Sequence, residues 1–155
     1  MKKFLALAAA IVMLLLVVAG SMASSAAPAP AVQYFAGLSN NAHARGLGVV
    51  IAIGPIHARG RDVVVNRHTD RFVFPRGTIT LTHRRRGQHN HVDRVTCYFT
   101  HTEHGFYKVT SGTGAYTGAS GHGKYKLAVS AVQCRGQRNP RIFQLHLFAA
   151  GPMRA

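Results

Sequence analysis

The glycine-rich stretch at residues 111–126 constrains the fold of this chain more than any other segment. It reads SGTGAYTGASGHGKYK and holds five glycines. A helix is excluded, because each interior glycine costs about 1 kcal/mol relative to alanine. A dinucleotide-binding turn is excluded as well, since three residues separate Gly114 from Gly118 and no helical pattern follows. We therefore predict tight turns and bulges that let two adjoining strands bend sharply.

Apolar residues recur at every second position in several segments, and this period is typical of strands with one buried face. The clearest examples are residues 79–83, 95–99, 125–131 and 141–149. Short runs rich in β-branched or aromatic residues precede them, each bounded by Gly, Pro, Asn or Asp. We expect an all-β fold of about eight strands, either a sandwich or, as we prefer, a small closed antiparallel barrel of the calycin type. Residues 84–91 and 103–105 are predicted to be polar turns.

The N-terminal segment has the three parts of a secretory signal peptide. Lys2 and Lys3 precede an unbroken apolar run at 4–19, and small residues follow at 20–27. A retained membrane anchor is the alternative, but 16 apolar residues fall short of the ~20 that span a bilayer. We predict a signal peptide at 1–26, cleaved near Ala23 to Ala27, a Pro/Ala-rich linker at 27–46 and a barrel domain at 47–155. The mature protein is expected to be secreted.

The charge balance of the mature chain favours anionic partners. Without Lys2 and Lys3 the basic side chains number 17, which against four acidic ones gives a formal charge of +13. Such an excess suits anionic cell-surface polymers, although it also describes an ordinary solvated surface. Arg84, Arg85 and Arg86 are the candidate anion-binding residues, since guanidinium groups grip phosphate or carboxylate in bidentate fashion.

Two other ligand classes are not expected. Histidines gather around the same segment, but the adjacent arginines would repel a cation, so we predict no metal site and no cofactor. Tyrosines are interleaved with the basic residues, but the chain lacks the signatures of the common nucleic-acid-binding folds. Nucleic acid is therefore not an expected partner.

Cys97 and Cys134 are the only cysteines. In an exported protein such a pair indicates a disulfide more often than two free thiols. A nucleophilic cysteine is the alternative, but it would need an activating partner that the sequence does not locate.

Three pieces of the chain resemble one known group of barrels. They are GPIHARG at 54–60, Asp70 with FVFPRG at 72–77, and GTGAYTGASG at 112–121. Together they resemble the allene oxide cyclase barrel-like family and its dirigent relatives, over residues 47–151. The resemblance implies an eight-stranded antiparallel barrel with an apolar cavity, assembled as a homotrimer. It also implies an activity that holds a reactive apolar guest in one conformation, either to cyclise it or to guide its coupling.

The candidate cavity residues are Asp70, His101, Tyr107 and His146. Asp70 could instead be a turn-forming residue before a strand, and each of the other three could be a polar group satisfied inside the fold. No nucleophile elbow, phosphate loop or paired-carboxylate signature is present. Our first hypothesis is a non-catalytic or dirigent-like barrel that binds or guides a small apolar or aromatic molecule. The alternatives are a cyclase- or isomerase-like enzyme that uses the same cavity, and a surface protein that binds anionic polymer through Arg84–Arg86. Whether the protein is an enzyme stays open, and we lean toward binding alone.

Overall fold

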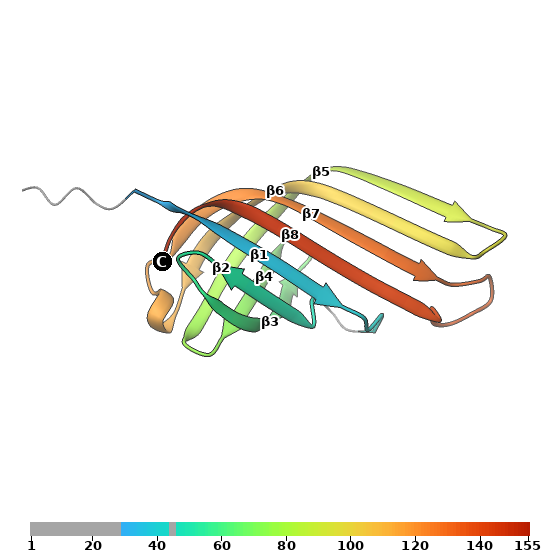
Figure 1. Ribbon diagram of the computed structural model, residues 1–155, viewed down its shortest axis with the longest axis horizontal. Helices are drawn as coiled ribbons and strands as arrows, with labels where there is room; N and C mark the ends of the chain where they lie inside the picture. Colours follow the sequence, from blue (N-terminus) through green and yellow to red (C-terminus); the bar gives the residue numbers. More distant parts are fainter. Residues whose placement is uncertain (1–28, 44–45) are drawn as a thin grey trace, which may run out of the picture.

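The computed structural model describes residues 29–43 and 46–155, whose eight strands form a closed antiparallel barrel (Figure 1). Each strand pairs with its neighbours in the sequence, and the first pairs with the last. The predicted all-β barrel is thereby confirmed, whereas the predicted signal peptide and its cleavage site lie outside the described residues. The elements in chain order are β1 (Ala31–Ser39), β2 (Val49–Ile53), β3 (Ala58–Asn66), β4 (Thr69–Phe74), β5 (Gly77–Asp93), β6 (Tyr98–Gly112), the 3₁₀ turn η1 (Gly114–Tyr116), β7 (Ser120–Val132) and β8 (Ile142–Arg154).

The first strand corrects the predicted linker at 27–46. Residues 31–39 pair along β8, and Gln33, Phe35 and Gly37 point into the barrel. Phe35 is fully buried. The two-residue period of this strand is hard to see in the sequence, because a glutamine and a glycine occupy two of its three inward positions. The barrel domain therefore begins at Ala31, not at residue 47.

The inward faces of the strands form one apolar core at the closed end of the barrel. Aromatic rings link its walls: the Phe35 ring lies 5.4 Å from that of Phe72 and 6.1 Å from that of Tyr107, both edge to face. Ile79 and Leu81 are buried on β5, as their alternation predicted. Among the described residues no helix is long and apolar enough to cross a membrane.

Strands β5 to β8 run well beyond the closed part of the barrel (Figure 1). The pairing of β4 with β5 ends at Thr82, so that the rest of β5 has β6 as its one neighbour. Residues 84–91 and 103–105, predicted to be turns, lie instead inside β5 and β6. Polar side chains can occupy these positions because water reaches much of this extension, and the actual turn lies at 94–97.

The predicted disulfide is confirmed. Cys97 in the β5–β6 turn is bonded to Cys134, just after the end of β7, at a sequence separation of 37 residues. On the chain-entropy account a loop of this length gives roughly 3–4 kcal/mol of stability. The bond ties together the far ends of the strand extension and is compatible with an extracellular location.

The glycine-rich stretch makes the predicted tight turn between two strands. It leaves β6 at Gly112, forms η1 and enters β7 at Ser120. Gly114 and Gly118 adopt φ values of +62° and +82°, a region that favours glycine.

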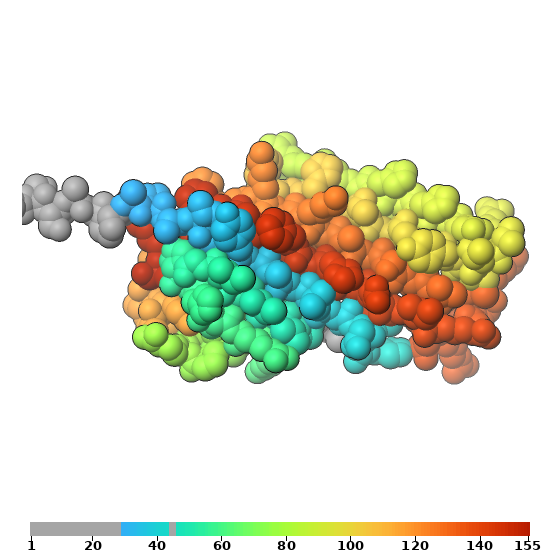
Figure 2. All heavy atoms as spheres, in the orientation of Figure 1, coloured from blue at the N-terminus to red at the C-terminus, as the bar shows by residue number. Residues whose placement is uncertain are grey.

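An apolar patch lies on the outside of the barrel, on β1, β2 and β8. These strands adjoin one another on the face seen in Figure 2. Cross-strand pairing places Tyr34 opposite Ile53, and the Tyr34 ring lies 6.3 Å from that of Phe148. We call the patch the outer apolar face, and its exposed large side chains are Val32, Tyr34, Leu38, Ile51, Ile53 and Phe148.

We expect Gln33→Leu to destabilise the barrel by about 2–3 kcal/mol, because it leaves two buried main-chain groups without partners. The Gln33 amide is fully buried; its Nε2 donates to the Ile56 carbonyl at 3.1 Å, and its Oε1 accepts from the Ile56 N–H at 2.8 Å. Denaturant unfolding measures the loss. Gln144→Leu, on the exposed side of β8, is the matched control and should change stability by less than about 0.5 kcal/mol.

Candidate functional site

A cavity of about 220 Å³ lies inside the barrel. It is smaller than the pockets of about 300–1,000 Å³ that take drug-sized ligands, so its guest must be small. Most of its wall is apolar, and the lining residues come from every strand except β2 and from the segment before β2. The principal apolar residues are Phe35, Phe72, Leu81, Leu127, Leu145 and Leu147.

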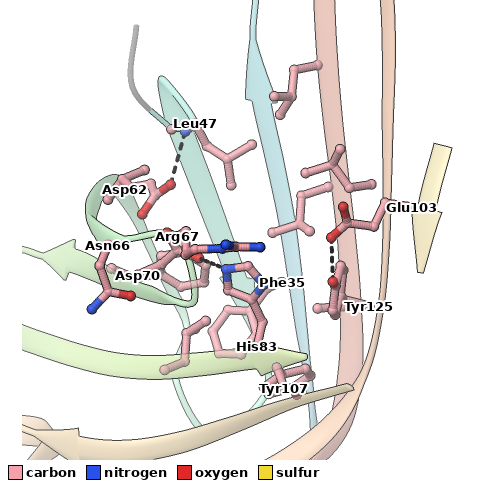
Figure 3. A pocket seen from close by; sticks show the side chains of 18 residues that line it. Phe35, Leu47, Asp62, Asn66, Arg67, Asp70, His83, Glu103, Tyr107 and Tyr125 are labelled. Atoms are coloured by element: carbon pink, nitrogen blue, oxygen red, sulfur yellow. Dashed lines mark hydrogen bonds and ion pairs between the residues drawn. The ribbon is translucent and has the colours of Figure 1, made fainter. Parts of the chain in front are cut away.

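Three of the four carboxylates in the chain line this one cavity. They are Asp62 on β3, Asp70 on β4 and Glu103 on β6. Figure 3 shows both aspartates on the β3–β4 hairpin, with Glu103 on the opposite wall. Since burial of a carboxylate costs free energy, their gathering in a strongly basic chain marks the cavity as the candidate site.

Asp62 is held at the cavity wall by the main chain. Its Oδ2 accepts a hydrogen bond from the N–H of Leu47 at 3.1 Å. Its Oδ1 is buried and has no hydrogen-bond partner among the described residues. Burial raises the pKa of Asp62 to about 6, although the bond from Leu47 acts in the opposite direction.

Asp70 forms a pair with His83. The two side chains approach to 3.3 Å between Oδ2 and Nε2, and both are largely shielded from water. Burial raises the pKa of Asp70 to about 6 and lowers the pKa of His83. Two carboxyl groups that titrate near pH 6, one of them beside an imidazole, can donate or accept a proton close to neutral pH.

Glu103 and Tyr125 form a second polar pair on the opposite wall (Figure 3). The Tyr125 hydroxyl donates to Oε1 of Glu103, and burial together with this bond raises the pKa of Tyr125. The guanidinium of Arg85 lies 3.6 Å from the other carboxylate oxygen, and Nε2 of His101 lies 3.7 Å from it. Glu103 is thus already engaged on both of its oxygens.

Tyr107 brings an unsatisfied hydroxyl to the cavity. The residue is 4% exposed, and its hydroxyl has no partner among the described residues. Burial raises its pKa to about 12, so Tyr107 stays protonated and offers a hydrogen-bond donor.

Two glycines set the positions of the cavity tyrosines. In the β6–β7 register Tyr107 lies opposite Gly123, and Tyr125 lies opposite Gly105. A Cβ at residue 123 would lie 2.7 Å from Cε1 of Tyr107, and one at residue 105 would lie 2.8 Å from Cε1 of Tyr125. Each ring therefore lies over a position that only glycine can occupy, because any other side chain there would displace the ring.

Of the four predicted cavity residues, two line the cavity and two do not. Asp70 and Tyr107 line the cavity. His101 lies beside Glu103, outside the lining, and Asn90 is its hydrogen-bond partner. His146 is exposed on the outside of β8, so its assignment to the cavity was wrong. It alternates with Leu145 and Leu147, whose side chains point inward.

Sequence reasoning missed six polar residues of the cavity: Asp62, Asn66, Arg67, His83, Glu103 and Tyr125. The alternation of β5 and β7 had already placed His83 and Tyr125 on inward faces, and that signal could have identified them. Glu103 was hidden by the turn predicted at 103–105.

The predicted anion-binding arginines lie on a strand and have different surroundings. Arg85 pairs with Glu103 and donates to the Gln88 side chain, whereas the Arg86 guanidinium lies 5.4 Å from the centre of the Phe106 ring. In the part of the chain that the structure describes, no cluster of three or more His, Cys, Asp or Glu side chains could hold a metal ion.

Comparisons with models of protein families, with curated proteins and with solved structures found no match to this chain.

We expect Asp62→Asn to stabilise the protein at neutral pH but not at acid pH. The native pKa of about 6 exceeds the ordinary value of 3.8, so the native state binds this proton more tightly than the unfolded state does. Wild-type stability should therefore fall as the pH rises from about 4 to 6, by about 1–2 kcal/mol for this group. Unfolding curves at pH 4 and pH 7.5 measure the difference between variant and wild type.

Asp93 supplies a control, because its pKa is lowered and its effect on stability therefore changes with pH in the opposite direction. Hydrogen bonds from the Thr96 side chain and from the Val95 and Thr96 N–H groups lower its pKa, so its contribution is present at neutral pH and is lost in acid. Asp93→Ala should accordingly be the less stable protein at pH 7.5. Equal stabilisation by Asp62→Asn at both pH values would contradict the assignment.

Proposed function

We propose that the protein is a secreted barrel that binds or guides one small apolar or aromatic molecule in its cavity. The observation that carries the proposal is a cavity whose wall is apolar except for a few polar groups, two of which have unpartnered atoms. These atoms are Oδ1 of Asp62 and the hydroxyl of Tyr107. The resemblance to allene oxide cyclase and dirigent barrels supports the same function.

The unpartnered atoms indicate what polar groups the guest should carry. A buried polar atom without a partner costs about 1–3 kcal/mol, and a ligand that satisfies it recovers that cost. Oδ1 of Asp62 requires a donor when ionised, and the Tyr107 hydroxyl requires an acceptor. The fitting guest has an apolar body with a hydroxyl or carbonyl group at its edge.

The second candidate is a cyclase- or isomerase-like enzyme that uses the same cavity. The observation that favours it is the Asp70–His83 pair, together with the two aspartate pKa values near 6. A carboxyl group that is partly protonated near neutral pH can act as a general acid toward a carbonyl or ether oxygen. The deprotonated fraction can act as a base, so that both directions of proton transfer are available.

Self-association belongs to the same proposal. The resemblance implies a homotrimer, and the outer apolar face offers a surface that copies of the chain would cover. Secretion is supported by the N-terminal sequence pattern and by the disulfide.

Leu147→Trp should abolish retention of the guest, because its larger side chain fills space in the cavity. Native mass spectrometry of the protein from its own culture medium measures the retained small molecule and the number of chains. The matched control is His146→Trp, the same change one residue away on the outside of β8. Retention of the same molecule by Leu147→Trp would contradict binding in the cavity.

For the enzyme candidate, we expect wild-type protein in D₂O to exchange a C–H proton of the retained molecule, or to convert it to an isomer. Asp70→Asn should keep the molecule bound and slow this reaction at least about 100-fold, the usual contribution of general acid–base catalysis. Mass spectrometry and NMR of the extracted molecule measure both. If the wild-type protein binds the molecule but leaves it chemically unchanged, the enzyme candidate is contradicted, and binding or guiding remains as the function.

A further inference from the structure

A second hollow adjoins the mouth of the cavity. Arg67, His83 and Glu103 line both spaces, so the two lie next to each other. The remaining residues that line the hollow are His68, Arg84 and Arg85.

The hollow has an excess of positive charge. Arg67 and Arg85 lie on the same side of the sheet as Glu103, whereas Arg84 alternates with the inward His83 and pairs with the exposed Phe106. These two arginines against Glu103 leave one positive charge among the residues that line the hollow when both histidines are neutral. Glu103 is already held by Tyr125 and Arg85. Arg67 forms no ion pair with any other residue that the structure describes, so its donors are free for a ligand.

The turn that carries Arg67 is fixed against β5. Oδ1 of Asn66 accepts the N–H of His68 at 2.9 Å, and the N–H of His83 donates to the His68 carbonyl at 2.9 Å. Figure 3 shows Arg67 extending from this hairpin over His83, toward the wall that bears Glu103. Its guanidinium therefore lies between the cavity and the hollow, where the polar end of a guest would emerge.

We infer that the hollow binds the anionic head group of an amphipathic ligand whose apolar body fills the cavity. The inference rests on the proposed function and names the class of molecule that the cavity takes. The unpaired guanidinium of Arg67 suits an anion, and the fork of an arginine fits the oxygens of a carboxylate or a phosphate ester. Arg67 is thereby the principal anion-binding residue, beside the Arg85–Glu103 pair.

The test compares n-hexyl phosphate, n-hexanoate and n-hexanol, which share an apolar chain and differ in the head group. We expect calorimetry at low salt to show hexyl phosphate binding at least about tenfold more tightly than hexanol, the effect of one charge-assisted contact. Arg67→Gln should remove most of this gain. Arg71→Gln is the control, since it makes the same change of charge on the exposed side of β4.

Glu103→Gln should change the affinity for hexyl phosphate in the direction opposite to Arg67→Gln. Loss of the one negative charge in the hollow should tighten binding of hexyl phosphate relative to binding of hexanol, the comparison that removes any effect of Glu103 on the cavity itself.

The outcomes separate the two proposals. Binding of hexanol without any gain from the phosphate would overturn the anion site and leave the cavity proposal standing. No binding of any of the three compounds would count against both. Equal losses in Arg67→Gln and Arg71→Gln would reduce the effect to general charge attraction and overturn the anion site.

Discussion

The pairing of β1 with β8 is the interaction on which the rest of the structure depends. Nine consecutive residue pairs, from Ala31 with Met153 to Ser39 with Leu145, turn a bent sheet into a barrel. Closure brings Phe35 of the first strand against Phe72 and Tyr107, which lie on strands far along the chain. It also removes two sheet edges and encloses the space in which the carboxyl groups lie. Without this ladder there would be neither a core nor a cavity.

The buried carboxyl groups work against the stability that closure provides. A chain with four acidic residues places three of them around one apolar cavity, and the pKa values of two are raised because ionisation is disfavoured there. Polar groups that oppose folding without full compensation are typical of functional sites. The Asp62 oxygen and the Tyr107 hydroxyl show this most directly, since each has lost water without gaining a protein partner.

The sequence predicted the barrel better than it predicted the site. Alternation in β5, β7 and β8 placed Ile79, Leu127 and Leu145 on inward faces, because strands with one buried face show a period of two. The same rule failed for β1, where Gln33 and Gly37 interrupt the apolar pattern. It failed for the strand extension as well, because water-exposed strands carry the residues that are typical of turns.

Site residues were harder to predict, because a cavity is made by neighbours that are distant in the sequence. Asp70 and Tyr107 do line the cavity, whereas His146 lies on the other side of its strand. Asp62 and Asp70 already share the β3–β4 hairpin, but Glu103 joins them around one cavity only after the sheet has closed. The glycines at 105 and 123 were visible from the start, but only the β6–β7 register shows that each makes room for a tyrosine.

The part of β5 that extends beyond its pairing with β4 carries arginines and histidines that have a role even without a ligand. From Arg84 onward this strand has no partner on one side, so its main-chain N–H and C=O groups could recruit a strand from another molecule. A register shift between Arg85 and Gly87 interrupts the regular edge, and its side chains are charged or polar almost to its end. Both features discourage edge-to-edge pairing. The charge of this segment thus discourages aggregation of the barrel, and replacement of its arginines by apolar residues would create a template for cross-β growth.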